Sequence, residues 1–136
     1  MSITYDTRKD LPCLPLCRLF RAVGWSDGNE TETMLANFSK PFIHSTLVFS
    51  AWDGDLLVGC VRVLSDRMFR SVIYDLAVLP EYQGQGIGHE LIRRCLAEYP
   101  DSEWLVQTIP ERIGFYETLG FQNHGDPVLH LPCKWF

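Results

Sequence analysis

An apolar run at 72–79 leads through Pro80 into a glycine-rich loop and then into an amphipathic helix. The run is too short to span a membrane and contains β-branched residues, so it predicts a central strand with both faces covered. The loop carries Gly84, Gly86 and Gly88, and apolar residues then recur at helical spacing for about three turns. Because a helix that connects two strands makes them parallel neighbours, this unit predicts an α/β sheet.

The segments on either side of this unit predict further strands and helices. Asp53-Gly54 is a strong hairpin signal between two apolar segments, which predicts an antiparallel pair. Asn29 is the expected cap of a helix that ends before Pro41. The whole order predicts a mixed sheet covered by helices, an α/β (α+β) fold. The expected strands are Ile3–Asp6, Thr46–Trp52, Leu56–Leu64, Trp104–Ile109 and one or two strands in Phe121 and Val128–Phe136, and the expected helices are Leu16–Val23, Glu30–Phe38, 87–99 and Arg112–Leu119.

Length and composition bound the class of protein. A chain of 136 residues is the size of one domain, so we expect a single domain over residues 1–136. Hydrophobic residues make up 46% of the chain, which argues against disorder, and no apolar segment approaches the ~20 residues of a membrane helix. The N-terminal segment has no apolar signal sequence, and the five cysteines show no C-x-x-C spacing. These features predict a cytoplasmic protein with free thiols and no metal site.

The charge balance is acidic, with 12 Lys and Arg against 17 Asp and Glu. A nucleic-acid-binding protein usually has a basic patch or stripe, whereas the basic residues here are scattered along the chain. We therefore expect neither a nucleic acid nor a membrane as the partner.

The glycine loop is suited to an anionic ligand. Glycines remove side chains that would keep a ligand away from the backbone, and the first N–H groups of a helix have no partner within it. The helix dipole adds partial positive charge, so a phosphate or diphosphate fits this position. No lysine follows the glycines, which excludes a P-loop, and His89 stands where a dinucleotide-binding turn has its third glycine.

Two motifs occur in this chain in a fixed order. The first is a Leu-Ala-Val-x-Pro strand end at 76–80 followed by Gln-x-x-Gly-x-Gly at 83–88. The second is Gly-Phe-Tyr-Glu-Thr-Leu-Gly-Phe at 114–121. Together they resemble the acyl-CoA loop and the Phe-Tyr-x-x-x-Gly-Phe helix of the GNAT superfamily of N-acetyltransferases, in particular its small bacterial single-domain members. The order of the predicted elements is also similar, so the resemblance extends over essentially the whole chain.

The resemblance implies a mixed, mostly antiparallel central sheet flanked by helices. Its central strands, at 74–79 and 104–109, would splay apart and form an acyl-CoA cleft, with acetyl-CoA as the acyl donor. Relatives often carry a cofactor-contacting Asn and an Ala where this chain has Ile109 and Arg112. The cofactor-binding residues that the resemblance implies are Leu76, Ala77, Val78, Gln83, Gly84, Gln85, Gly86, Ile87, Gly88 and His89.

The resemblance also implies direct transfer of the acetyl group to a primary amine of a small molecule or peptide. Tyr116 is the candidate that protonates the leaving thiolate, because the tyrosine of the second motif points at the thioester sulfur in relatives. Its alternative role is a core aromatic packed against Phe115. Asp75, an acid in an apolar strand, is either hydrogen-bonded structurally or a general base with a raised pKa, and ordered water is another candidate base.

Trp25 and Tyr74 are the candidate acceptor-binding residues. The connection between the first two helices forms one wall of the acceptor pocket in relatives, where Trp25 can either line the pocket or cover the core. Tyr74 replaces a Glu of the glucosamine-phosphate acetyltransferases that this segment resembles, so their acceptor contacts do not carry over directly. A non-catalytic acyl-CoA sensor or interaction module is the alternative to an enzyme. The apolar C-terminal segment predicts either completion of the sheet in a monomer or the contact of a homodimer.

Overall fold

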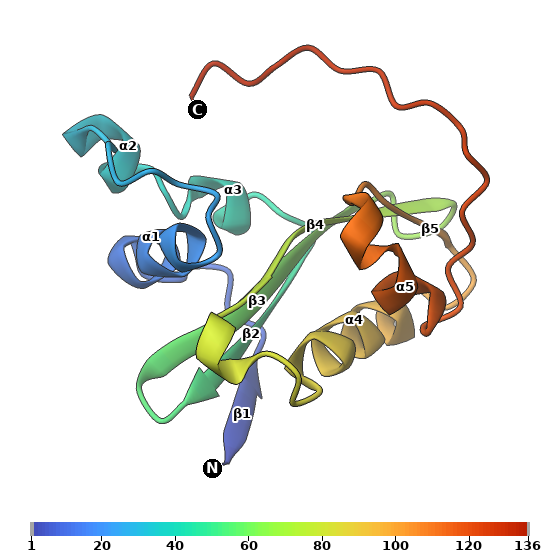
Figure 1. Cartoon of the computed structure of the whole chain (residues 1–136), viewed down its shortest axis with the longest axis horizontal. Coiled ribbons are helices and arrows are strands. Elements are labelled where there is room, and N and C mark those ends of the chain that lie inside the picture. Colours follow the sequence, from blue (N-terminus) through green and yellow to red (C-terminus); the bar gives the residue numbers. More distant parts are fainter. Residues whose placement is uncertain (1, 136) are drawn as a thin grey trace.

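The computed structural model describes residues 2–135, and its centre is a five-stranded sheet (Figure 1). The strands lie in the order of the chain: β1 (Ile3–Asp6), β2 (Leu47–Asp53), β3 (Leu56–Ser65), β4 (Arg70–Val78) and β5 (Glu103–Val106). The first four strands pair antiparallel, and β4 pairs parallel with β5. The prediction of a mixed, mostly antiparallel sheet is therefore confirmed, as is its parallel pair.

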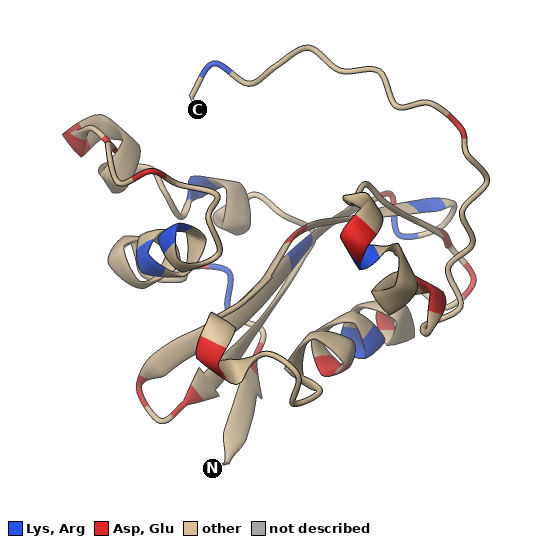
Figure 2. Ribbon diagram, viewed as in Figure 1, with Lys and Arg blue, Asp and Glu red and all other residues tan. Residues whose placement is uncertain are grey.

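Helices cover both faces of this sheet. In Figure 1 the first three helices lie on one side of the strands, and the last two lie on the other. Most Lys, Arg, Asp and Glu residues are on helices and loops, and few are on the central strands (Figure 2). No helix within residues 2–135 is long and apolar enough to cross a membrane. The helices are α1 (Cys13–Ala22), α2 (Glu32–Ala36), α3 (Lys40–Ile43), α4 (Ile87–Glu98) and α5 (Ile113–Glu117), with 3-10 turns η1 (Pro80–Tyr82) and η2 (Pro110–Arg112).

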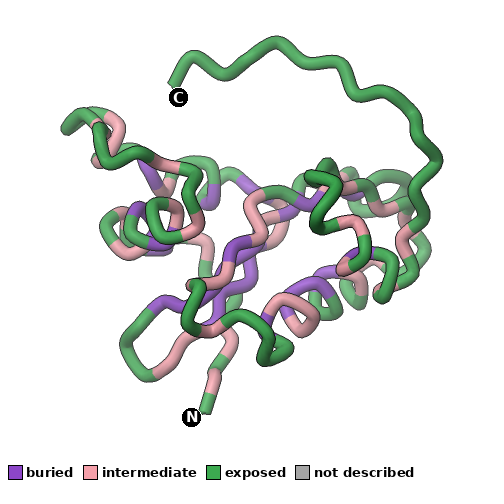
Figure 3. The backbone as a smooth tube through the Cα atoms, in the orientation of Figure 1, coloured by how far each residue is buried: buried purple, intermediate pink, exposed green. Residues whose placement is uncertain are grey.

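Alternation along the strands divides the core into two layers. Phe49 and Val61 point to the layer that also contains Leu91 and Cys95 of α4. Their strand neighbours point to the opposite layer, which contains Leu16 and Phe42 on the helices α1 and α3. Figure 3 shows the buried backbone concentrated on the central strands and on parts of α1 and α4. The two layers therefore lie on opposite sides of one sheet, as the period of two along a strand requires.

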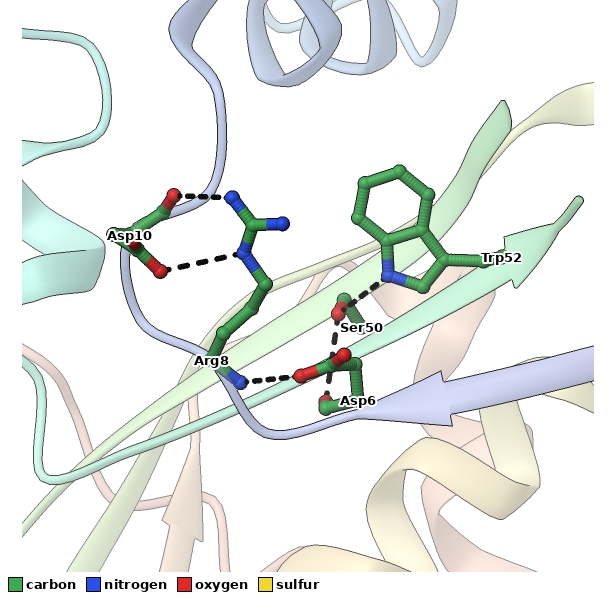
Figure 4. A network of polar contacts seen from close by, with 5 residues as sticks. All are labelled: Asp6, Arg8, Asp10, Ser50 and Trp52. Atoms are coloured by element: carbon green, nitrogen blue, oxygen red, sulfur yellow. Dashed lines mark hydrogen bonds and ion pairs between the residues drawn. The ribbon is translucent and has the colours of Figure 1, made fainter. Parts of the chain in front are cut away.

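A small polar network joins β1 to the start of the next segment (Figure 4). Arg8 donates its backbone N–H to Asp6 Oδ1 at 2.8 Å and its Nε to Asp10 Oδ1 at 3.3 Å. Ser50 on β2 accepts from the Trp52 indole at 2.9 Å and donates to the Asp6 carbonyl at 3.4 Å. These bonds satisfy polar groups at the sheet edge, so the network has a structural explanation.

The helix predicted at 30–38 is shorter than expected and is followed by another helix. Thr31, rather than Asn29, is its cap, and the Thr31 hydroxyl accepts from the Met34 N–H at 3.2 Å. Pro41 does not end a helix but lies in the first turn of α3, where the missing N–H of a proline costs no hydrogen bond.

The final strands predicted at Phe121 and at 128–136 are wrong for the described residues. Residues 121–135 form neither helix nor strand, and Phe136 lies outside the described residues. The side chains of Leu129 and Leu131 are 92% and 95% exposed. The segment runs away from β5 in Figure 1, so its apolar residues have no neighbouring strand with which to pair.

Candidate functional site

The two strands at the parallel end of the sheet separate after four residue pairs. Pairing of β4 with β5 begins at Arg70 and Glu103 and ends at Ile73 and Val106. On its other side, β4 remains paired with β3 as far as Val78. The segment 74–78 therefore has a neighbouring strand on one edge only, and the predicted strand at 104–109 is shorter because its C-terminal half has no ladder partner.

A β-bulge interrupts β4 where the two strands separate. Tyr74 pairs with Arg62, whereas Ala77 pairs with Cys60, so β4 contains one residue more than β3 in this interval. Asp75 has a positive φ of 54°, which is uncommon for a residue other than glycine. Such local strain clusters at functional sites, so the bulge makes this point of the strand a candidate part of the functional site.

The glycine loop between β4 and α4 presents backbone amides. Gly84 and Gly86 have φ values of 77° and 87°, and a Cβ at either position would meet no atom within 4 Å. The first backbone bond into α4 runs from the Glu90 N–H to the Gly86 carbonyl at 3.0 Å. Within residues 2–135, the amides of residues 87–89 have no backbone acceptor. The loop therefore combines open space with free donors at the positive end of a twelve-residue helix.

Side chains of the loop bond back to the protein and fix its path. Gln83 Nε2 donates to the Val78 carbonyl at 2.9 Å. The Tyr82 hydroxyl donates to Asp53 Oδ2 at 2.6 Å, and this hydrogen bond raises the pKa of Tyr82 because it favours the protonated phenol. These two bonds join the end of β4 to the loop and the 3-10 turn η1 to the β2–β3 hairpin. Because both side chains are engaged, the loop amides are the groups available to a ligand.

Gly88 and His89 also connect α4 to α5. A Cβ on Gly88 would lie 3.3 Å from Phe115 Cζ, which is tighter than an ordinary contact, so glycine allows the phenyl ring to pack against the start of α4. The His89 ring lies 4.7 Å from the Phe115 ring, and its Nε2 is 2.8 Å from Thr118 Oγ1. The His89 side chain is therefore directed toward α5, and its backbone amide is the group left for an anion.

Tyr116 on α5 is buried beside the separating strands. It is 8% exposed and belongs to the same apolar cluster as Ile73, the last residue paired with β5, and Ile87, the first of α4. Its ring packs edge-on against Phe115 and Phe121, at centroid distances of 5.0 and 5.5 Å. Burial raises the pKa of the Tyr116 hydroxyl, an effect that the nearby Arg112 cation opposes. Among the described residues the hydroxyl has no hydrogen-bond partner, so a protonated donor is available here.

Asp75 is paired with a residue that the motifs did not identify. Asp75 Oδ2 accepts from Arg62 Nε at 2.6 Å. The Arg62 guanidinium also lies 5.1 Å from the Tyr74 ring centre and 5.9 Å from that of Phe42. The signal for Arg62 was present in the sequence, because it is the one charged residue in the apolar segment 56–64. Charged residues within such a strand are expensive to bury and therefore have partners.

Trp25 lies on the same side of the sheet as this ion pair. It is 46% exposed and packs edge-on against Phe20 at 5.2 Å, and Phe20 in turn contacts Phe42 at 6.3 Å. An ion pair between Arg21 and Glu30 at 2.7 Å closes the loop that carries Trp25 and lowers the pKa of Glu30. Aromatic contacts therefore run from Trp25 to Phe42, and the Arg62 guanidinium links Phe42 to Tyr74, the other residue expected to contact an acceptor.

The chain matches known proteins in sequence and in fold. A family model described as an acetyltransferase (GNAT) domain matches residues 44–123, more than half of the chain. The chain belongs to the GNAT acetyltransferase family. The matched region contains the separating strands, the glycine loop and Tyr116, so the features above are those of a GNAT domain.

Relatives of this GNAT chain extend beyond it in length. An uncharacterized N-acetyltransferase ycf52 of Gracilaria tenuistipitata var. liui is 28% identical over 82% of this chain and 62% of its own length. Histone acetyltransferase TAP1 of Glycine max is 36% identical over 98% of this chain and 61% of its own. The chain thus spans less than two thirds of these two relatives. A solved GNAT-family acetyltransferase of Streptococcus pneumoniae TIGR4 is 27% identical with a TM-score of 0.79, covering 98% of this chain and 99% of that one.

The GNAT chain departs from the family pattern on the segment before α5. Ile109 is 58% exposed, and its carbonyl accepts from the Arg112 N–H at 3.0 Å in the turn η2. Neither side chain is an amide, so no amide side chain from these two positions is available to a cofactor. On this side of the site, a cofactor would therefore be bound by backbone groups rather than by an amide side chain from these two positions.

Two surface hollows lie away from the glycine loop. One, of about 460 Å³, is lined by Glu90, Arg93, Arg94, Leu96 and Ala97 on α4. The other, of about 370 Å³, adjoins the network of Figure 4 at the edge formed by β1 and β2. Neither hollow includes the separating strands, so the GNAT site is defined here by strand register and free amides rather than by a closed cavity.

Proposed function

We propose that the chain is an acetyl-CoA-dependent N-acetyltransferase that transfers an acetyl group directly to a primary amine. The observation that carries the proposal is the separation of β4 from β5 after Ile73, directly beside the free amides at the start of α4. A gap between parallel strands accepts an extended ligand as an added strand, and free helix amides bind phosphates. One elongated ligand with an amide-bearing arm and a diphosphate satisfies both features.

The residues present fit such a ligand. Gly84 and Gly86 leave open space at the loop, where side chains would otherwise stand between a diphosphate and the amides. Leu76 and Val78 lie on the part of β4 beyond its pairing with β5, and their N–H groups would bond the pantetheine arm, because the Val78 carbonyl already accepts from Gln83 Nε2. The loop residues 84–89 would hold the diphosphate through their N–H groups, whereas the N–H of Gln83, also predicted to bind the cofactor, already donates to the Pro80 carbonyl at 3.3 Å. Acetyl-CoA supplies an activated acyl group with a thiolate as the leaving group.

Tyr116 is the proposed proton donor to that thiolate. Its pKa is raised by burial, so the hydroxyl is protonated at neutral pH and has no competing partner within residues 2–135. Asp75 is the proposed contact for the amine, because Oδ2 is bonded to Arg62 while Oδ1 has no partner among the described residues. Asp75 or an ordered water would take the amine proton. A free N–H near Leu76 or Val78 would stabilise the developing negative charge on the carbonyl oxygen, an effect of about 2.7–4 kcal/mol in other enzymes.

The acceptor is a primary amine of a small molecule or a peptide. Trp25 and Tyr74 are 46% and 40% exposed, and both lie on the face of the sheet opposite Tyr116, where they would contact the acceptor. The name of the Glycine max relative, a histone acetyltransferase, favours a lysine side chain as one candidate. A cytoplasmic location and a monomeric or homodimeric state stay predictions.

The test uses the purified chain with CoA and acetyl-CoA. We expect calorimetry to detect CoA binding and a thiol reagent to detect CoA release when primary amines are added. Binding without release across alkylamines, arylalkylamines, amino acids and lysine peptides would instead support the non-catalytic sensor. Absence of CoA binding by the folded chain would overturn both functions.

A further inference from the structure

Arg62 and Asp75 form a charged pair within an otherwise apolar part of the sheet. The Arg62 side chain is 18% exposed and the Asp75 side chain 30% exposed, so each is partly desolvated and still reachable from solvent. Their strand neighbours Cys60 and Ala77 are fully buried. Because charged groups are costly to desolvate, a pair in this position needs either a structural or a ligand-binding explanation.

The pair leaves bonding groups unused on both partners. Only Nε of Arg62 and Oδ2 of Asp75 take part in their 2.6 Å bond. Within residues 2–135, the two Nη groups of Arg62 donate to no acceptor, although a guanidinium presents five N–H donors in a planar fork. Asp75 Oδ1 likewise accepts no bond from the described residues. A fork of donors and a carboxylate oxygen therefore stand next to each other without partners.

The surroundings place these groups where an acceptor would lie. Asp75 is in the bulge where β5 leaves β4, one residue before the backbone edge proposed to hold the acyl donor. The Arg62 guanidinium lies over the rings of Tyr74 and Phe42, on the face covered by α1 and α3. Tyr116 belongs to the cluster on the opposite face. An acceptor on the Arg62 side and a donor on the Tyr116 side would therefore meet at the gap between the strands.

The charge of the pair selects among amines. A simple alkylammonium would bind Asp75 next to the positive charge of Arg62, which opposes its binding. An amine that also carries a carboxylate would place its ammonium at Oδ1 and its carboxylate at the guanidinium fork, which is the preferred geometry of carboxylate recognition by Arg. A zwitterion thus satisfies every unused group of the pair.

We propose that the Arg62–Asp75 pair makes the site specific for an acceptor with a carboxylate beside its amine, as in a free amino acid. Arg62 is then a specificity-determining residue that contacts the acceptor carboxylate. This inference rests on the proposed acetyltransferase function and names the substrate class for that site.

The experiment compares amino acids with their decarboxylated amines at saturating acetyl-CoA. The probe pairs are tryptophan with tryptamine, phenylalanine with phenethylamine and alanine with ethylamine. We expect kcat/KM to favour the amino acid by about tenfold or more in the unaltered chain, because leaving the partly buried guanidinium fork unpaired penalises the decarboxylated amine. The readout is the ratio of the two kcat/KM values, which we compare between variants so that differences in amine basicity cancel.

Two variants separate charge recognition from a folding role. Arg62→Met combined with Asp75→Asn removes both charges together, so that no unpaired charge is left buried, whereas Arg62→Lys keeps the charge without the fork. We expect the preference for the amino acid to fall about tenfold in the double variant and partly in Arg62→Lys. The matched control is Arg70→Met with Glu103→Gln, an exposed ion pair between β4 and β5, which should leave the preference unchanged.

The outcomes distinguish this inference from the function on which it rests. If no amine of either kind is acetylated, the proposed function fails and the inference fails with it. If the amines are acetylated but the decarboxylated forms are equal or better substrates, the function stands and the inference is overturned. An unfolded double variant leaves Arg62→Lys to decide, because an unchanged preference in that variant also overturns the role of the fork.

Discussion

The two faces of the sheet offer a ligand different kinds of groups. On the face covered by α4 and α5, the available groups among the described residues are backbone amides of residues 84–89 and the buried phenol of Tyr116. On the face covered by α1, α2 and α3, they are the side chains of Arg62, Asp75 and Tyr74. Backbone donors suit the proposed acyl donor, whose CoA part does not vary. Side chains suit the acceptor, because their identity can be matched to its chemistry. We infer that the first face is sensitive to backbone conformation and the second to charge.

The largest expected effect tests the one functional side chain of the α4 face. We expect Tyr116→Phe to lower kcat about 100-fold, because proton transfer by a positioned group contributes about 10²–10⁴-fold. Stability should change little, since the hydroxyl has no partner within the described residues. Steady-state kinetics measures kcat, and denaturant unfolding measures the free energy of unfolding. An unaltered kcat would assign Tyr116 to the core alone.

A substitution in the glycine loop tests the dependence of this face on backbone conformation. Gly86→Ala forces a Cβ into a left-handed conformation at φ 87°, which costs about 1–2 kcal/mol, and we expect CoA to bind about tenfold more weakly as the loop shifts. Gly24→Ala is the matched control, because Gly24 has φ 86° and equally open surroundings in a different loop. Calorimetry with CoA should separate the two variants. Equal weakening in both would show that the loop acts only through overall stability.

Buried thiols on the two faces predict a loss of stability at alkaline pH. Burial raises the pKa of Cys95, on the buried side of α4, from 9.0 to about 12, and burial also raises that of Cys60 on the other face. Below pH 9 the thiols are protonated in both the folded and the unfolded chain, so their contribution to the free energy of unfolding is fully present. Between pH 9 and about 12 only the unfolded chain loses it, so the free energy of unfolding falls by about 1.4 kcal/mol per pH unit for each thiol.

Cys95→Ala measures the contribution of the α4 face to this slope. We expect denaturant unfolding at several pH values to show a slope reduced by one proton, whatever the absolute stability of the variant. Cys133→Ala is the control, because that thiol is exposed and is expected to leave the slope as it is. An identical slope in Cys95→Ala and the unaltered chain would contradict the assignment.

The smallest expected effect concerns His89. We expect His89→Ala to lower the free energy of unfolding by about 0.5–1 kcal/mol, because the bond to Thr118 and the contact with Phe115 are lost at an exposed position. CoA affinity should stay within about twofold, since the amide of residue 89 is retained. Thr118→Val removes the bond to His89 together with the bond from the Thr118 hydroxyl to the Phe115 carbonyl, so its effect is an upper bound for the bond to His89. A large loss of CoA affinity in His89→Ala would place the imidazole itself on the ligand.

The backbone face was largely predictable from the sequence, whereas the side-chain face was not. Glycine, proline and motif spacing act locally, so the loop at 83–88 and the start of α4 follow from neighbouring residues. The partnership of Arg62 with Asp75 depends on strand register and on a bulge, which no local pattern encodes. The Thr31 cap was missed because Asn29 offered an equally suitable cap two residues earlier.

The prediction of C-terminal strands was wrong for a related reason. An apolar alternation such as that at 128–131 is suited to a strand, but a strand forms only beside a partner with free backbone groups. β5 has only four residues, and the C-terminal segment runs away from it. The glycine loop, α4 and α5 formed where the motifs predicted a loop and helices, because these elements depend on the motifs rather than on the end of the chain.

The extra residue at the bulge has a consequence for how β4 can vary. Tyr74 and Ala77 pair with Arg62 and Cys60 on one face of the sheet although they are three positions apart. Deleting Asp75 would restore strict alternation and keep Tyr74 and Ala77 on the same face, but it would remove both the bulge and the carboxylate that is paired with Arg62. Insertions and deletions should therefore be better tolerated in the turn at 66–69 than between Tyr74 and Val78, where the bulge positions the carboxylate beside Arg62.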